Sequence, residues 1–458
     1  MARPTFPYSL ARLALAAGLL LAGPAMAQVA GQVEFSRGVG FAQSPGETPR
    51  TLGKGLPLRQ GDRLTTSEGA SAIIKLEDGT RMTVRPNSEM VLQTYQFKED
   101  AADNTMLMQL VRGGFRAVTG LISKNAPGAA RIQTNTATIG IRGTDFDARV
   151  CTRDCATESS RVSENSRPNT VQASAKVVNA QGALNAVDGA GQRRRLVDGG
   201  SVYPGDTVET GAGTRAILAF RDDTRITLGS TTRFRVDNFV YDESNAGEGR
   251  FLASLLKGSV RALTGLIAKA NSRNVGFSTA TATIGVRGSG ADLVCTGACA
   301  GEPGDGNSGL SIFSWLGGWT VQETGQTAIQ LLQAGQGLFI TPTGIRTITN
   351  QPDAEGQRPD GVTLPPKLFE REEMSGAEEG LFVFVRDGHI ELLTANDILQ
   401  LGKGEAGFAG ANGETKRPID VPKFLDFDRL PLPNSRNPLL VSVLNDNNVN
   451  RDKNNQCK

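Results

Sequence analysis

The sequence contains a single histidine, and this scarcity excludes most catalytic arrangements. His389 is the only histidine among 458 residues, so a Ser-His-Asp or Cys-His site would have to be built on it. It follows Asp387-Gly388, a pair typical of a hairpin turn, and we expect it to be a solvent-facing strand residue. Paired carboxylates are plentiful in principle, but no pair stands out. The sequence therefore predicts a protein that is not an enzyme, with no catalytic residue and no cofactor.

Aromatic residues and long apolar runs are also scarce. Aromatic side chains make up 5% of the chain, and beyond the N-terminus no run reaches the roughly 18 apolar residues of a membrane-spanning helix. By contrast, 55 glycines and 21 prolines are present, as expected for many short strands joined by tight turns. The length allows two or three domains. We therefore predict an all-β protein without a transmembrane segment in the mature chain.

The N-terminus has the pattern of a secretory signal peptide. Arg3 and Arg12 precede an apolar run at 13–22, and Ala25-Met26-Ala27 provides small residues for cleavage. The run is too short to span a bilayer comfortably. We expect cleavage after Ala27 and export of the chain.

The charge is balanced, which argues against nucleic-acid binding. Without Arg3 and Arg12, 47 basic residues face 47 acidic residues, whereas a nucleic-acid binder has a basic excess or stripe. Arg193-Arg194-Arg195 is the one dense basic cluster, and we assign it to a solvated hairpin tip.

An internal repeat dominates the organisation of the chain. Residues 116–124 (RAVTGLISK) return at 261–269 (RALTGLIAK), and residues 136–143 (TATIGIRG) return at 281–288 (TATIGVRG). Self-similarity at a fixed offset indicates a tandem duplication. In each copy the apolar residues alternate with a period of two, which predicts strands. A meander or sandwich of antiparallel strands and a short solenoid both remain open.

The repeat and the polar, Pro- and Gly-rich stretches divide the chain. We predict a signal peptide at 1–27, a first module at 28–155, a linker at 156–172, a second module with a closing hairpin at 173–345, a linker at 346–366, a C-terminal β-hairpin region at 367–430 and a disordered tail at 431–458.

The five cysteines are expected to form two local disulfides. Cys151 and Cys155 recur as Cys295 and Cys299, and an exported protein meets an oxidising compartment. The four thiolates would also suit zinc, but they lie in separate modules, and we predict no metal site. Cys457 is left over and has no assigned partner.

The motifs of both copies resemble the FecR domain. Pro204-Gly205-Asp206, Lys257-Gly258-Ser259-Val260 and the late Gly-x-Arg-Gly signature are present in the second copy, and the first copy matches at Gly61-Asp62 and 139–144. The domain is named for the periplasmic part of the iron-dicitrate sensor-regulators of Gram-negative bacteria. The resemblance implies a β-rich module of the bacterial envelope.

The late signature supplies six family-motif residues, each with two interpretations. An arginine between glycine amides suits a carboxylate or phosphate, or it locks strand ends through backbone carbonyls while glycine allows unusual backbone angles. We favour the structural interpretation. The residues are Gly140, Arg142, Gly143, Gly285, Arg287 and Gly288.

The departures from the sensor-regulators shape the functional prediction. Those proteins carry a cytoplasmic anti-sigma segment and a transmembrane helix before this domain, whereas this chain has a signal peptide there. The resemblance therefore implies contact with other envelope proteins rather than iron sensing. We predict an interaction or signalling protein of the periplasm or cell surface, which presents strand edges or hairpin loops to a protein partner of unknown identity.

Binding of cell-wall or capsule glycan is the alternative. Trp315 and Trp319 are four residues apart, so on a strand both rings lie on one face. They would form a glycan-stacking shelf or fill the core, and we favour the core because tryptophan is usually well buried.

Overall fold

The computed structural model describes residues 29–425 except 100, 102, 127, 164, 192, 305–307, 366 and 375–377. The predicted signal peptide, Cys457 and the predicted disordered tail lie outside these residues. Within the described part of the chain, no helix has the length and apolar character needed to cross a bilayer.

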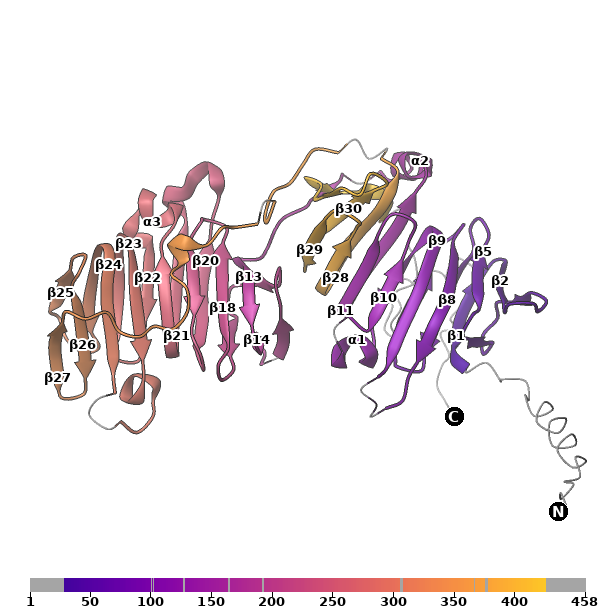
Figure 1. Cartoon of the computed structure of the whole chain (residues 1–458). Coiled ribbons are helices and arrows are strands. Elements are labelled where there is room, and N and C mark those ends of the chain that lie inside the picture. The colour runs from indigo at the N-terminus through magenta and orange to yellow at the C-terminus, as the bar shows by residue number, and fades with distance from the viewer. Residues whose placement is uncertain are drawn as a thin grey trace, which may run out of the picture.

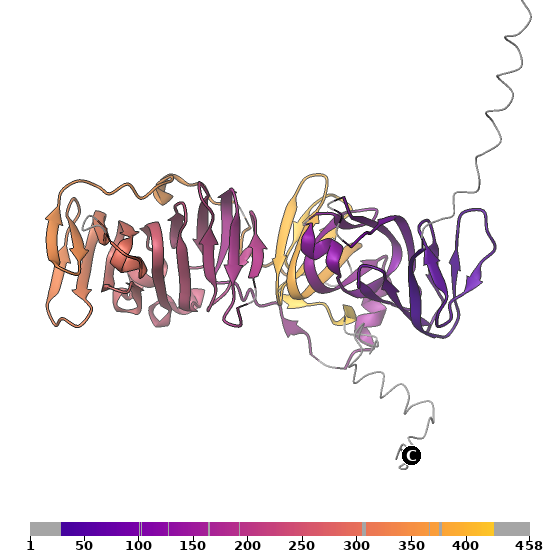
Figure 2. The same cartoon turned by 90° about the horizontal axis from the view of Figure 1, so that it is seen from below.

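The chain forms two large β modules that lie end to end (Figures 1 and 2). Each is a hydrogen-bonded sheet of 15 strands. The prediction of an all-β protein with two tandem modules is confirmed.

The first module contains strands from both ends of the described chain. They are β1 (Val29–Arg37), β2 (Gly40–Gln43), β3 (Arg50–Thr51), β4 (Pro57–Arg59), β5 (Arg63–Thr66), β6 (Ser71–Leu76), β7 (Arg81–Val84), β8 (Glu89–Gln96), β9 (Thr105–Val118), β10 (Ala130–Gln133), β11 (Thr138–Cys151), β28 (Gly380–Leu393), β29 (Ile398–Gly402), β30 (Ala406–Gly410) and β31 (Thr415–Lys416).

The second module is continuous in sequence. Its strands are β13 (Ala175–Gln181), β14 (Leu184–Val187), β15 (Arg193–Leu196), β16 (Ser201–Val202), β17 (Thr207–Thr210), β18 (Arg215–Phe220), β19 (Arg225–Leu228), β20 (Arg233–Val240), β21 (Arg250–Leu263), β22 (Val275–Ser278), β23 (Ala282–Cys295), β24 (Leu310–Glu323), β25 (Ile329–Leu332), β26 (Gly337–Thr341) and β27 (Gly344–Ile348).

Short helices and one small ribbon complete the structure. The α-helices are α1 (Leu121–Asn125), α2 (Asp154–Ser160) and α3 (Leu266–Ala270); the 3-10 helices are η1 (Glu243–Glu248), η2 (Ser272–Asn274), η3 (Gly297–Ala300), η4 (Pro359–Gly361) and η5 (Lys423–Leu425); and β12 (Arg167–Pro168) pairs with β32 (Asp420–Val421).

Long strands connect two layers within each module. The first half of β9 pairs with β8, whereas its second half pairs with β7 and β11. Strands β11 and β28 divide in the same way, as do β21, β23 and β24 in the second module. Alternate side chains of both layers point inward and form one apolar core per module.

The C-terminal strands complete the first module rather than forming a unit of their own. Strand β28 pairs with β11 along twelve residue pairs, and β30 and β31 extend the sheet further. Figure 1 shows β28 and β30 beside β11 at the end of the first module. The second module is thus inserted between two parts of the first, and β28 to β31 correspond to β24 to β27.

Asp387-Gly388 does not form the predicted hairpin turn. Both residues lie inside β28, where the pairing with β11 is interrupted by a bulge. Gly388 has a φ of +86°, so the residue type that suggested a turn instead permits a bend of a long strand.

Candidate functional site

The two modules meet along one edge of each sheet. The joint, which we call the junction, lies between β29 and β30 of the first module and β13 and β16 of the second. The Lys403 backbone amide donates to the Tyr203 hydroxyl over 2.7 Å. The Asn169 side chain accepts from the Ala406 amide over 2.7 Å and donates to the Ala406 carbonyl over 2.9 Å. Polar groups of the first module are therefore matched by polar groups of the second module and of the segment that precedes β13.

A buried ion pair lies at the centre of the junction. Lys176 Nζ is 3.2 Å from Glu405 Oε2 and donates to the Gln400 carbonyl over 2.9 Å. Arg417 Nε lies 3.5 Å from the same carboxylate, and the Lys176, Glu405 and Arg417 side chains are all buried. Burying an ion pair removes two charges from water, so each charge depends on its partner.

Burial and charge act differently on the two partners. Burial lowers the pKa of Lys176 to about 8, because loss of hydration outweighs the attraction of Glu405. Burial alone would raise the pKa of Glu405, but the charges of Lys176 and Arg417 outweigh it and hold that pKa below its ordinary value. Glu405 is therefore ionised at neutral pH, and Lys176 is mostly protonated.

The backbones approach closely at the junction. Gly199 has a φ of +77°, and a Cβ atom placed on it would lie 2.0 Å from Cγ of Gln400. A Cβ on Gly404 would lie 3.1 Å from Nε2 of Gln172. Gln400 of the first module and Gln172, just before β13, thus cover glycines on both edges of the junction.

A cleft of about 970 Å³ opens beside the junction. Its lining includes Lys124, His389 and Lys403 from the first module and Arg194 and Tyr203 from the second. His389 is half-buried, with Nε2 2.5 Å from Oε1 of Gln400, so the prediction of a solvent-facing residue is wrong.

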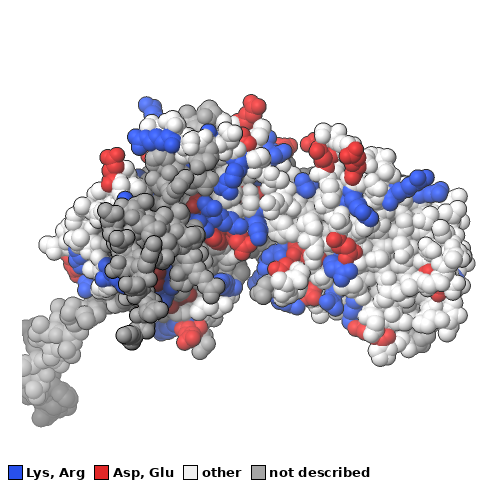
Figure 3. Space-filling view, turned by 180° about the vertical axis from the view of Figure 1, so that it is seen from behind, with Lys and Arg blue, Asp and Glu red and all other residues white. Residues whose placement is uncertain are grey.

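The basic triplet 193–195 directly follows the turn of the hairpin formed by β14 and β15, and it also lines this cleft. It lies in β15, which pairs with β14. Arg194 forms an ion pair with Asp206, and Lys403 lies 3.4 Å from Asp387. Figure 3 shows basic and acidic side chains intermixed around the middle of the molecule. Carboxylates therefore offset much of the positive charge of the cleft.

Both predicted disulfides are present, Cys151–Cys155 and Cys295–Cys299. They lie on opposite sides of equivalent strands. In the sheet, Val150 pairs with Gly113 while Cys295 pairs with the equivalent Gly258, so the cysteines differ by one residue in register. A shift of one residue reverses the direction of a strand side chain. Cys295 accordingly belongs to the inner core, whereas Cys151 belongs to a separate cluster with Phe382.

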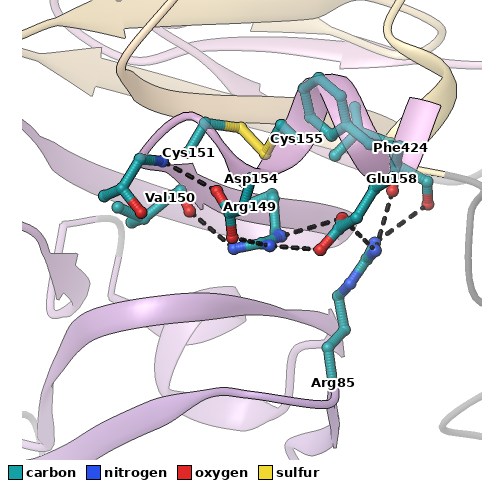
Figure 4. Close-up of a disulfide and its surroundings, with 10 residues drawn as sticks. Arg85, Arg149, Val150, Cys151, Asp154, Cys155, Glu158 and Phe424 are labelled. Atoms are coloured by element: carbon teal, nitrogen blue, oxygen red, sulfur yellow. Dashed lines mark hydrogen bonds and ion pairs between the residues drawn. A yellow bond between two sulfur atoms is a disulfide. The ribbon is translucent and has the colours of Figure 1, made fainter. Parts of the chain in front are cut away.

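Charged residues fasten the first disulfide to the sheet (Figure 4). The buried Arg149 lies 2.5 Å from Asp154 and forms a second ion pair with Glu158, both on α2. Arg85, which follows β7, lies 3.3 Å from Glu158 and donates to the Phe424 carbonyl over 2.8 Å. This network ties α2 and the last described residues to the first module, which is a structural role.

The two tryptophans do not form a stacking shelf. Trp319 is fully buried in the core of the second module. Trp315 is half-buried, its indole donates to Asp292 over 3.0 Å, and Arg358 lies 4.1 Å above its ring. The paired surface on which the glycan alternative depended is therefore absent.

The late Gly-x-Arg-Gly signature marks a bend in the long strands. The pairing of β11 with β28 is interrupted after Arg142, and Gly143 has a φ of +62°. The equivalent interruption in β23 follows Arg287, beside Gly288. Gly140 and Gly285 precede these bends in their strands.

The expected contacts of the motif arginines are not observed. The Arg142 side chain lies outside the described residues. Arg287 is exposed and forms no hydrogen bond or ion pair within the described part of the chain. Its predicted contact with backbone carbonyls is therefore absent, although the glycines do provide the unusual backbone angle at Gly143.

The described residues contain no group of three or more His, Cys, Asp or Glu side chains arranged to hold a metal ion. The functionally interesting residues that sequence reasoning missed are those of the junction. Lys176 could have been noticed in the sequence, because it stands between the apolar residues Ala175 and Val177 where the first copy has Gln32.

Comparison with known protein families gives one family that matches both modules. The model of the FecR protein family matches residues 62–166 and 206–298. No curated protein matches the chain. Two crystal structures of a putative anti-sigma factor from Parabacteroides distasonis are each 13% identical, with a TM-score of 0.24, over 32% of this chain and 61% of that chain. A likeness with this TM-score carries no argument about fold or function.

The chain spans less than two thirds of the length of those structures. The family match stands independently of them, because it covers the central strands of each module. Each β module thus contains one region that matches the FecR protein family.

Proposed function

We propose that this protein is a non-enzymatic component of the bacterial envelope, acting in the periplasm or at the cell surface by binding another protein through its FecR modules. Its role is in signalling or regulation, and its partner is recognised by a sheet edge. The two disulfides support an oxidising compartment.

One observation carries this proposal. The edge of the second module formed by β25, β26 and β27, here called the distal edge, is uncovered within the described chain. Leu331 is 62% exposed and Ile345 39% exposed on it. Figure 3 shows few charged side chains at this end of the molecule. An uncovered strand edge with apolar side chains is a template for pairing with another chain.

Capture from native envelope extract tests the proposal. The bait is the full chain, expressed with its own N-terminal segment and purified after export. Leu331→Lys places a charge on the distal edge, and Val240→Lys is the matched control, because Val240 is 56% exposed on the central strand β20. We expect a retained envelope protein that is lost with Leu331→Lys and kept with Val240→Lys. Equal retention by all three baits would contradict the proposal.

A further inference from the structure

The distal edge of the second module has an equivalent in the first module, and that equivalent edge is covered at the junction. The junction therefore indicates what kind of surface the distal edge can bind. Strands β28 to β30 occupy the places of β24 to β26. The side chain of Glu405 accepts from the amide of Gly402, and that of Gln336 accepts from the amide of Gln333. Gln336 is thus the counterpart of Glu405, and the sheet pairing makes Leu331 the counterpart of Gln400.

The two edges differ in being covered. Gln400 is half-buried and Glu405 is buried at the junction, whereas Leu331 and Gln336 are exposed. A Cβ atom on Gly404 would meet Gln172, while one on its counterpart Gly335 would meet nothing within 4 Å. The distal edge therefore has the same strand arrangement as the edge of β29 and β30, but no described residue packs against it as the second module packs at the junction.

A complementary open edge exists at the start of the first module. Strand pairing makes Gln32 the counterpart of Lys176, and Gly55 corresponds to Gly199 because their amides donate to Val33 and Val177 respectively. Gln32 is exposed, and a Cβ on Gly55 would meet nothing within 4 Å. We call this surface of β1 and β4 the proximal edge.

Charge distinguishes the outer edges from the junction. At the junction, a lysine meets a glutamate; at the outer edges, both positions are glutamine. A proximal glutamine against Glu405 would remove that carboxylate's buried lysine partner, and Lys176 against the distal Gln336 would lose its counter-charge. The two neutral edges therefore match each other, and the two charged edges match each other. Pairing a neutral edge with a charged edge is unfavourable, and this penalty makes the contacts specific.

We propose that the distal edge binds the proximal edge of a second copy of this chain, in the geometry of the junction. The proposal rests on the proposed function in one respect, namely that the distal edge is a docking surface. In this arrangement Gln336 of one copy lies near Gln32 of the next, where two amides can exchange hydrogen bonds. Leu331 packs over Gly55 as Gln400 packs over Gly199. Such a head-to-tail contact is heterologous, so it builds open chains of modules.

Sedimentation velocity of the purified full chain over a concentration series tests this inference. We expect the weight-average sedimentation coefficient to rise with concentration. Leu331→Lys and Gln336→Glu should each weaken association at least about tenfold in Kd, because each places an unpaired charge in the contact. Val240→Lys should associate like the parent protein, and matching melting curves will show that all variants fold.

Several results would overturn the inference. A parent protein that sediments as a monomer at every concentration would refute it, as would association that Leu331→Lys and Gln336→Glu leave unchanged. A monomer that still captures an envelope protein through Leu331 would refute only the second-copy partner and leave the proposed function intact. Self-association without any captured envelope protein would support the second copy as the partner and would contradict the binding of a different envelope protein.

Discussion

In the first module, the edge of β29 and β30 packs against another module, whereas in the second the equivalent edge of β25 and β26 is uncovered by any residue that the structure describes. The covered edge has a buried glutamate with a lysine partner, and the open edge has an exposed glutamine. The same strand arrangement thus serves once as an internal interface and once as an external surface.

The modules also differ in continuity. The second is formed by one continuous stretch, while the first depends on strands that follow the second in sequence. Leu381, Val383 and Ile390 of β28 belong to the core of the first module. The second module should therefore fold alone and the first should not.

Separating the modules should give the largest effect. A fragment of residues 170–362 contains every strand of the second module and should unfold cooperatively in urea. A fragment of residues 29–166 lacks β28 and should show no cooperative transition, because its core is incomplete. Adding residues 378–425 as a separate chain should restore the transition. Cooperative unfolding of 29–166 alone would break the comparison.

Removing the buried carboxylate should give the next largest effect. Glu405→Ala leaves Lys176 buried without its acidic partner, so we expect a loss of about 3–5 kcal/mol in the free energy of unfolding. The matched change at the open edge, Gln336→Ala, should cost no more than about 0.5 kcal/mol, because that side chain is exposed. Equilibrium urea unfolding measures both, and equal costs would contradict the assignment of the junction.

Removing either disulfide should cost about 2 kcal/mol, since each closes a loop of only a few residues. The region that loses protection should differ between the two disulfide variants. Cys151→Ala with Cys155→Ala should expose the outer cluster around Phe424 to proteolysis, whereas Cys295→Ala with Cys299→Ala should increase hydrogen exchange in the core of the second module. Identical protection patterns would contradict the opposite facing of the two bonds.

The smallest effect concerns pH. Because the pKa of Lys176 is about 8 in the folded chain and its ordinary value is 10.5, the unfolded chain binds more protons between these values. The stability that Lys176 contributes should therefore rise from pH 7.5 to 9.5, by less than about 1.4 kcal/mol per pH unit. Urea unfolding of the parent and of Lys176→Met at both pH values isolates the contribution. A parent that loses stability relative to Lys176→Met across this interval would contradict it.

The local features of the fold could be predicted from sequence because their causes are local. Apolar alternation indicates strands, and two cysteines four residues apart in an exported chain indicate a local disulfide. The reversed facing of the disulfides was also readable. The repeat has an offset of 145 residues from Arg116 to Arg261 but of 144 from Cys151 to Cys295, and a one-residue change of register reverses a strand side chain.

The pairing of β11 with β28 could not be predicted in this way. The paired residues are more than 200 positions apart, and nothing in the local pattern of either strand identifies its neighbour. The junction also went unrecognised, because buried charge is decided by tertiary packing. Lys176 and Glu405 reveal themselves only when compared with Gln32 and Gln336, and that comparison requires the strand correspondence.

The central claim, that the outer edges bind each other as the junction does, is tested most directly by exchanging charges between two proteins. Gln32→Lys gives one protein a basic proximal edge, and Gln336→Glu gives the other an acidic distal edge. Sedimentation velocity should show each variant alone as a monomer and their equimolar mixture as alternating chains of the two variants. The two changed edges recreate the Lys176–Glu405 pair, and the two unchanged edges still match each other. A mixture that sediments as the two monomers, or variants that associate as well alone as together, would contradict the claim.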